Sequence, residues 1–353
     1  MSEKSFLLTL DYELYGDGSG DVFHNVVEPT GRLLAIARER GVKFTFFFEV
    51  VEYWCLNREW KSGNTMGYAS NPCAAMEQQM RQAVVEGHDV QLHIHPQWCN
   101  AVWRDGAWQV DNSQWRLADY AGDLTNLLSR GKQTLEDMLR PVKDDYRCIA
   151  LRAGGYNAFP GERIVAAMRE VGIIIDSSVV PGAVEKGSLS RYDYRLSPST
   201  LGYWYVDDRL DLPAAEGGDI IEMPIVSLPI VRLSKYLSLS RIKAIIANRK
   251  SAQKSFVAKT STSGGEGRLF SLWRKVKFLF EREYQTWDFC LFSESMHRKF
   301  ITSTVIGDRD VYVLVGHPKS LTGTADITEL LSHLRNDLHV CFTCMSQMAE
   351  QQS

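Results

Sequence analysis

Short apolar runs alternate with helical patterns along most of the chain, and this alternation constrains the fold more than any other feature. The apolar runs predict strands at residues 6–10, 42–48, 90–93, 148–152, 172–176, 220–224, 311–315 and 340–343. Helical spacing predicts helices at 29–40, 72–86, 118–139 (one long helix or two short ones), 160–170 and 327–335. Strands that are apolar on both faces and separated by helices are typical of buried parallel sheets. The sequence therefore predicts an α/β protein, a distorted (β/α) barrel of seven or eight units.

The length of 353 residues and the hydrophobic content of 44% suit one large domain. We expect a single barrel domain over residues 1–353, with a long insertion at approximately 228–296 before the penultimate strand. Within it, 242–254 is basic, 260–267 is rich in Ser, Thr and Gly, and 270–283 has a helical pattern. Basic helices can contact a membrane surface or a polyanion, although a solvated surface insertion has the same pattern.

Charge and cysteine content narrow the class of protein. The formal net charge of −3 argues against a dedicated nucleic-acid binder. Residues 1–5 lack the character of a signal peptide, and no run approaches the ~20 apolar residues of a membrane span. The seven cysteines show no disulfide framework, and Cys341 and Cys344 have the spacing of a redox pair or of two core residues. We expect a cytoplasmic protein with free thiols and no membrane span, with peripheral association left open.

Two histidines end the third predicted strand. Strand side chains alternate between faces, so His93 and His95 point the same way. Imidazole is a common ligand for zinc-like metals, and two imidazoles with a carboxylate leave room for a reactive water. The pair therefore indicates a metal site. The alternative is that both rings only make hydrogen bonds around a strand end.

Further polar residues follow other predicted strands. In a barrel of parallel strands, the carboxyl ends of the strands meet at one rim, where the chemistry of such barrels is found. Asp11 and Glu13 lie two residues apart and can face the same side if the strand continues. The other polar residues at strand ends are Arg152, Asp176, Glu222 and His317. This rim is the candidate site.

An ordered series of motifs resembles the polysaccharide deacetylases, the carbohydrate esterase family with the nodulation-type deacetylase domain. The series runs through residues 8–13, 44–47, 87–96, 151–156, 176–178 and 314–318. The resemblance covers residues 7–322 apart from the insertion. In two places the chain departs from the family: Asp11-Tyr12-Glu13 stands where the family has adjacent aspartates, and one residue separates the histidines instead of three.

The resemblance implies a metal-dependent hydrolase that removes an acetyl group from an N-acetylated sugar or sugar precursor. With a cytoplasmic location, it implies a place in surface polysaccharide or O-antigen biosynthesis. It also implies a divalent metal, zinc being expected, held by Glu13, His93 and His95. Asp11 is then expected as general base, although the roles of Asp11 and Glu13 can be exchanged.

The remaining roles concern proton transfer and the substrate. His317 lies in the family's final motif and is expected as general acid, while Arg152 would keep Asp11 ionised. Tyr156 could donate a hydrogen bond to the substrate, and Asp176 could contact it or support the site. Trp98 lies in a Trp-rich region, 98–114, which we expect to form a rim loop or lid. Its indole could stack on a sugar ring or pack in the interior.

Two other functions remain open. A glycoside hydrolase of a related barrel would need no metal and would use Asp11 with Glu13 or Glu222 as its carboxylate pair. A non-catalytic carbohydrate-binding barrel would bind a sugar without turnover. Metal content separates the first of these from the deacetylase.

Overall fold

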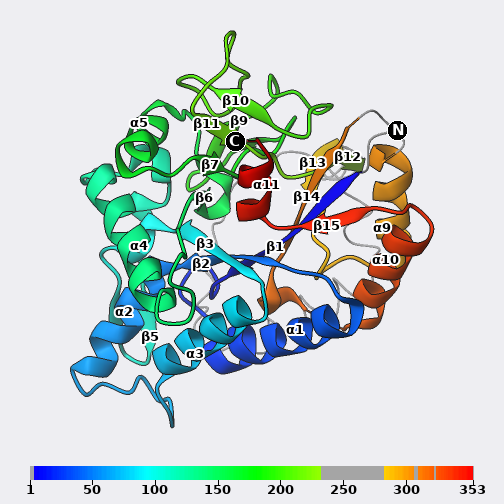
Figure 1. The fold of residues 1–353 in the computed structure, drawn as a ribbon. Coiled ribbons are helices and arrows are strands. Elements are labelled where there is room, and N and C mark those ends of the chain that lie inside the picture. The colour runs from blue at the N-terminus through cyan, green and yellow to red at the C-terminus, as the bar shows by residue number, and fades with distance from the viewer. Residues whose placement is uncertain (1–3, 232–281, 306–308, 322, 353) are drawn as a thin grey trace, which may run out of the picture.

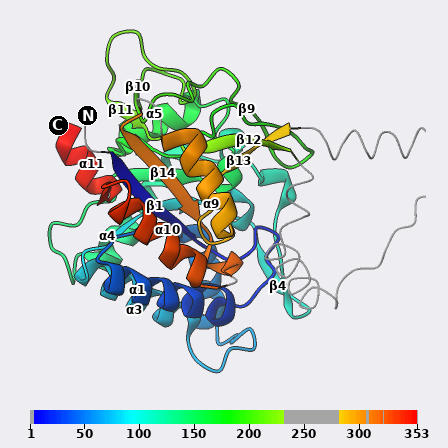
Figure 2. The ribbon, with the colours of Figure 1, turned by 90° about the vertical axis from the view of Figure 1, so that its right-hand side faces the viewer.

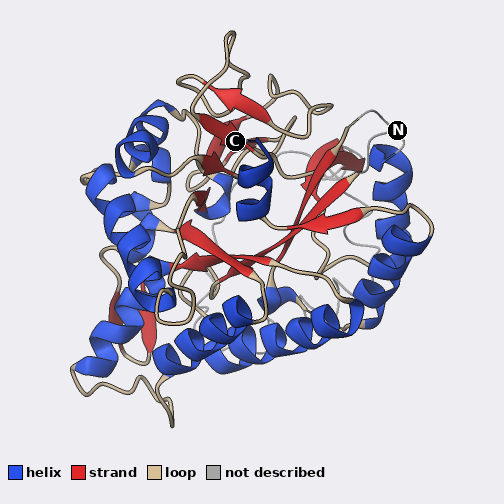
Figure 3. Ribbon diagram, in the orientation of Figure 1, coloured by secondary structure: helices blue, strands red, loops and turns tan. Residues whose placement is uncertain are grey.

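A sheet of mostly parallel strands forms the centre of the fold (Figure 1, Figure 3). The computed structural model describes residues 4–231, 282–305, 309–321 and 323–352. In spatial order the strands are β10 (Trp204–Val206), β11 (Ile220–Glu222), β7 (Ile175–Asp176), β6 (Ala150–Ala153), β3 (Asp89–Ile94), β2 (Thr45–Glu49), β1 (Ser5–Tyr12) and β14 (Val311–Gly316). β10 runs antiparallel to β11, and β15 (Cys341–Thr343) pairs in parallel with the start of β1.

The sheet curls into a barrel whose seam lies between β11 and β14. Two isolated parallel bridges, Ile225 to Val313 and Asp288 to Val315, span this seam in place of a regular strand. β11 ends at Glu222, shortly before Pro224, which has no N–H to continue a ladder. The prediction of a distorted (β/α) barrel is therefore confirmed, and the seam is where the distortion lies.

Helices cover the outside of the barrel (Figure 1). They are α1 (Glu28–Arg40), α2 (Val50–Lys61), α3 (Pro72–Val85), α4 (Leu124–Leu139), α5 (Glu162–Val171), α9 (Glu294–Phe300), α10 (Ala325–Asn336) and α11 (Met345–Gln352). Seen from the side, α9 and α10 lie over β14 and β1 (Figure 2). Among the described residues, every helix is too short or too polar to cross a bilayer.

The last helix, α11, closes the amino-terminal end of the barrel. The backbone N–H of Met345 donates to Thr45 Oγ1, and that of Ser346 donates to Asp89 Oδ2, both at 3.1 Å. Thr45 and Asp89 are the first residues of β2 and β3. The opposite, carboxyl-terminal rim is therefore the end at which a substrate can approach the strand termini.

Several segments differ from the sequence-based prediction. Residues 50–61, to which no element was assigned, form α2, and the predicted loop 98–114 contains a short hairpin, β4 (Val102–Arg104) with β5 (Ala107–Gln109). A second hairpin pairs β8 (Val184–Lys186) with β9 (Arg191–Asp193).

The long insertion is described only at its two ends. Here β12 (Ser227–Val231) pairs antiparallel with β13 (Arg282–Thr286), so the last two residues of the predicted helix 270–283 are in a strand. The rest of that helix, the basic segment 242–254 and the linker 260–267 lie outside the described residues.

Alternation along β2 separates the interior of the barrel from the helix layer. Phe46 and Phe48 contact the ring of Tyr12 on the side of the helices. Phe47, between them, points into the barrel, where its ring lies 4.0 Å from the guanidinium carbon of Arg152. The strand is therefore apolar on both faces because one face packs against helices and the other supports a buried charge.

The histidine before β3 makes stability depend on pH. His88 is buried and accepts a hydrogen bond at Nδ1 from the Phe44 N–H (2.9 Å), and burial lowers its pKa from 6.5 to about 4. Because the unfolded chain takes up this proton first, we expect the free energy of unfolding to fall by up to about 3 kcal/mol as pH drops from 6.5 to about 4. Denaturant unfolding of the wild type and of His88→Asn over this range measures the effect. A variant with the wild-type pH dependence would contradict this account.

Candidate active site

Polar side chains from four neighbouring strands meet at the carboxyl-terminal rim. The structure brings together six of the residues that the sequence predicts: Asp11, Glu13, His93, His95, Arg152 and His317. They lie at or just beyond the ends of β1, β3, β6 and β14, which are adjacent in the sheet apart from β2, between β1 and β3. The convergence follows from parallel strand order, because every strand delivers its last residues to the same rim.

One carboxylate contacts both histidines. Glu13 Oε2 lies 3.4 Å from His93 Nε2 and 2.7 Å from His95 Nε2. The two rings meet edge to face, with centroids 5.0 Å apart, and all three side chains are buried. His95 lies past the end of β3 but keeps an extended backbone, so the alternation of the strand continues to it.

Hydrogen bonds on the far side of each imidazole fix its orientation. His93 Nδ1 lies 2.8 Å from the carbonyl oxygen of Arg152, which can only accept, so Nδ1 carries a proton and Nε2 is the ring nitrogen that faces Glu13. His95 Nδ1 lies 2.8 Å from the amide nitrogen of Gln97, whose own Oε1 is buried without a partner among the described residues. A half-turn of this amide would let His95 donate from Nδ1 and present Nε2 in the same way.

These donors fit a divalent metal. His93 Nε2 and His95 Nε2 are buried and both face Glu13 Oε2, but in the described part of the chain neither makes a hydrogen bond of good geometry. Buried polar atoms without partners are rare, and two imidazoles with a carboxylate are a donor set that zinc prefers. Burial alone would raise the pKa of Glu13, but Lys319 and the two imidazoles hold it well below its usual value, so Glu13 is an anion here.

A second carboxylate, Asp11, lies beside a buried cation. Arg152 donates from one terminal nitrogen to Asp11 Oδ1 at 2.6 Å. Burial would raise the pKa of Asp11, but Arg152, His93 and His317 together lower it. The other oxygen, Oδ2, lies 3.5 Å from His317 Nε2. Asp11 is therefore an ionised group that faces a histidine across the rim.

His317 is held between two carboxylates. Its Nδ1 lies 2.8 Å from Asp288 Oδ2, on the side away from Asp11. Burial would lower the pKa of His317, but Asp288 and Asp11 raise it. His317 is therefore the group at this rim that most readily carries a transferable proton near neutral pH.

Three charged residues of the site were not predicted from the sequence. Glu49 ends β2, in register with His93, one residue beyond the predicted strand end at 48. Lys319 follows the final motif by two residues and donates to Glu13 Oε1 at 2.7 Å. Asp288 lies inside the predicted insertion, where no local pattern marks it. Extending the predicted second strand by one residue would have indicated Glu49, because that residue then lies beside His93 in the sheet.

The remaining three predicted site residues were expected to contact the substrate, and the structure places two of them in the interior. Trp98 is 1% exposed and packs edge to face against Trp108, so the expectation that its indole stacks on a substrate is wrong and the packing alternative holds. Asp176 is also buried; its carboxylate accepts from the Ser178 N–H and hydroxyl, so it supports the interior instead of contacting a substrate.

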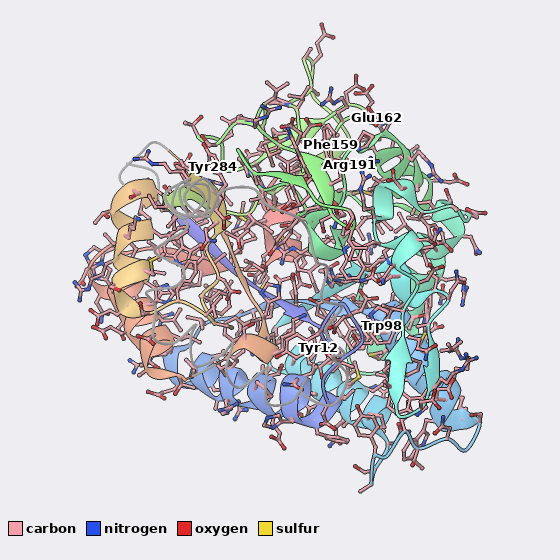
Figure 4. All side chains as sticks on the ribbon, turned by 180° about the vertical axis from the view of Figure 1, so that it is seen from behind. Tyr12, Trp98, Phe159, Glu162, Arg191 and Tyr284 are labelled. Carbon is pink, nitrogen blue, oxygen red and sulfur yellow. The ribbon has the colours of Figure 1, made fainter. Side chains whose placement is uncertain are left out.

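Tyr156, by contrast, borders a cavity of about 150 Å³. The wall of the cavity includes Tyr192, Tyr284, Thr286 and Asp288, the partner of His317. In the view from behind, Tyr284 lies at the upper left and Trp98 at the lower right of centre (Figure 4). The cavity therefore lies on the side of the catalytic candidates where β13 is found, away from the Trp-rich hairpin.

The structure also bears on the alternative function, a glycoside hydrolase that uses a pair of carboxyl groups. Glu222 is buried and accepts from the Val179 N–H, and Asp176 beside it helps to raise its pKa well above the usual value, after the larger effect of burial. Its hydrogen bond to Val179 therefore places Glu222 in the interior, whereas Asp11 and Glu13 are the carboxyl groups that lie beside His317, His93 and His95 at the rim.

Comparisons with known proteins find similar folds but no matching sequence. No protein-family model matches the chain, and no curated protein sequence matches it. A solved structure from Mycobacterium smegmatis, titled as a polysaccharide deacetylase, is 15% identical with a TM-score of 0.49, over 99% of this chain and 90% of that one.

Two further solved structures are similar at lower identity. A CE4-family pseudoenzyme from Bacillus anthracis is 9% identical with a TM-score of 0.39, over 98% of this chain and 65% of that one. A GH57 branching enzyme from Thermococcus kodakaraensis is 12% identical with a TM-score of 0.45, over 100% and 72%. A similar chain path does not by itself imply a similar activity.

The position of His95 depends on a glycine. A Cβ at Gly154 would lie 2.4 Å from the imidazole Cγ and Nδ1 of His95. We therefore expect Gly154→Ala to displace the ring and to lower the free energy of unfolding by about 1–3 kcal/mol, as overpacking does. The matched control is Gly31→Ala in α1, where the new Cβ meets only Gln79 at 3.9 Å and should be neutral or stabilising. Equal stabilities of the two variants in denaturant unfolding would contradict this prediction.

Proposed function

We propose that this protein is a metal-dependent hydrolase that removes an acetyl group from an N-acetylated sugar or sugar precursor. The observation that carries the proposal is that the Asp11 carboxylate and the His317 imidazole face each other at 3.5 Å. This pair lies next to the possible metal ligands Glu13, His93 and His95. We place the substrate in the cytoplasmic stage of surface polysaccharide or O-antigen assembly, in keeping with the family that the motifs resemble.

Glu13, His93 and His95 would hold the divalent metal, for which zinc is the ion that suits two imidazoles and a carboxylate. When bound, such an ion acidifies water and polarises an acyl carbonyl. Lys319 keeps Glu13 anionic through its bond to Oε1, so that Oε2 remains directed toward the two imidazoles. The carbonyl of Arg152 keeps the Nε2 lone pair of His93 directed to the same point.

Asp11 is the proposed general base. Its carboxylate takes a proton from the attacking water as the oxygen adds to the acetyl carbon. Arg152 keeps Asp11 ionised and oriented, because it binds Oδ1 and leaves Oδ2 facing the reaction space. Burial alone would raise the pKa of this carboxyl group, and Arg152, His93 and His317 outweigh that effect and keep Asp11 deprotonated before the reaction.

His317 is the proposed general acid. When the C–N bond breaks, the departing amine needs a proton, which His317 donates from Nε2; the products are acetate and a free amine on the sugar. Asp288 binds the opposite ring nitrogen and stabilises the charged form before the transfer. Two groups with pKa values pushed apart in this way are typical of an acid–base pair.

The cavity beside Asp288 is the proposed site for the sugar. It lies next to the histidine that would protonate the leaving amine, and it is lined by Tyr156, Tyr192 and Tyr284 with the polar side chains of Thr286 and Gln285. Tyrosine rings suit the apolar C–H faces of a sugar, while hydroxyl and amide groups suit its rim of hydroxyls.

Acetate release tests the function directly. We expect the zinc-loaded full chain to release acetate from at least one member of a panel of N-acetylated nucleotide sugars. Asp11→Asn and His317→Gln should each lower kcat/KM about 10²- to 10⁴-fold, the usual contribution of one proton-transfer group. His333→Gln on α10, far from the rim, is the matched control and should be unaffected. Tight sugar binding without any acetate release would contradict the proposal and favour a binding protein.

The pH profile tests the role of Asp288. His317 must be protonated to act as the acid, so activity should fall as pH rises through its pKa. Because Asp288 raises that pKa, Asp288→Asn should move the alkaline limb of kcat/KM to lower pH. The acidic limb, which reports on the base, should move less. An alkaline limb that stays in place in the variant would show that His317 is not the titrating acid.

A further inference from the structure

The two carboxylate oxygens of Glu49 have different surroundings. Oε1 accepts from the N–H groups of Val51 (3.0 Å) and Glu52 (3.4 Å), and so caps the first turn of α2. Oε2 is buried and has no hydrogen-bond partner in the part of the chain that the structure describes. The side chain is 0% exposed, so bulk solvent does not reach this oxygen. A buried carboxylate with one unpaired oxygen is unfavourable unless something else binds it.

Glu49 belongs to the same cluster of possible metal ligands as Glu13 and the two imidazoles. Glu49, Glu13, His93 and His95 each offer one ligand atom, and the four atoms all lie within 4.8 Å of one another. The side chains come from three adjacent strands: Glu49 from β2, which pairs in register with His93 on β3, and Glu13 from just past β1. Four nitrogen and oxygen donors around one point suit zinc, whose coordination can expand to five ligands and so still admit a water.

Charge balance also indicates that a cation is missing. Glu13 is already paired with Lys319, whereas Glu49 forms no ion pair with a lysine or arginine among the described residues. A divalent cation among these groups would supply the positive charge that the protein itself does not provide.

We propose that Glu49 is a fourth protein ligand of the metal, bound through Oε2, and that its Oε1 couples metal binding to the first turn of α2. The inference rests on the metal site of the proposed function and adds a ligand that the resemblance does not supply. It also has a conformational consequence: metal binding should fix the carboxylate that caps α2 and should therefore stabilise the amino-terminal end of that helix.

Zinc affinity of the full chain tests the ligand. Competition with a chromophoric chelator measures the dissociation constant of Zn²⁺ for the wild type, Glu49→Gln and Glu52→Gln. Gln keeps an oxygen to cap α2 and removes the anionic ligand, so Glu49→Gln should fold normally and bind Zn²⁺ at least about tenfold more weakly. Glu52 is a close control: it is equally buried, has its own unpaired oxygen and lies next to Glu13, but does not belong to the cluster. Glu52→Gln should bind Zn²⁺ nearly as the wild type does.

Hydrogen exchange of the α2 amides gives the second readout. Zn²⁺ should slow exchange at the first-turn amides of Val51 and Glu52 in the wild type and not in Glu49→Gln. Unchanged affinity in Glu49→Gln, or an equal loss in Glu52→Gln, would overturn the role of Glu49 and leave the three-ligand site intact. A wild type that binds no Zn²⁺ would overturn the metal site and the proposed hydrolase together, which distinguishes the two failures.

Discussion

The buried guanidinium of Arg152 is the interaction on which the rest of the site depends. Its side chain is 0% exposed, rests on the ring of Phe47 and donates to Asp11, Thr9 and Ser177. These partners belong to β1 and to the turn after β7, so one cation connects the two sides of the barrel interior. The carbonyl group of the same residue accepts from His93. Arg152 thus contributes both to the charge of the base and to the orientation of an imidazole.

Burial of charge explains why the site needs these partners. The described rim places several carboxylates in a volume with little water, and each is stabilised differently: Asp11 by Arg152, Glu13 by Lys319 and the imidazoles, and Asp288 by His317. Removing one member of such a pair leaves a buried charge uncompensated, which is far more costly than losing a surface pair. Glu49 is the carboxyl group of the donor cluster that forms no ion pair with a lysine or arginine among the described residues, and the proposed metal would supply that positive charge.

Much of the barrel could be predicted because the sequence pattern that indicates each strand lies within that strand. The continuous apolar runs of β1, β2, β3 and β14 reflect burial on both faces, and the same-face geometry of His93 and His95 follows from strand alternation alone. The alternation also placed Asp11 and Glu13 at the rim, where they lie in the structure. These features need only the periodicity of a strand and the parallel order of the sheet.

The residues that were missed depend on tertiary contacts. Asp288 lies near the end of the predicted insertion, and its bridge to β14 across the seam of the barrel brings it to His317. Glu49 was missed because the end of a strand is poorly marked by sequence, and here one residue decides whether a carboxylate joins the site. Trp98 was assigned an exposed role because an indole in a loop gives no sign of its burial, which comes from the hairpin that folds over it.

The metal content of the purified full chain tests whether Glu13, His93 and His95 hold a divalent metal. The account predicts about one tightly bound divalent metal per chain after exhaustive dialysis, and its loss in both His93→Ala and His95→Ala, because each variant removes one of the imidazoles that face Glu13. A chain that carries no metal and takes up none when zinc is offered would contradict the account. It would then favour a carboxylate-only hydrolase that uses Asp11 and Glu13.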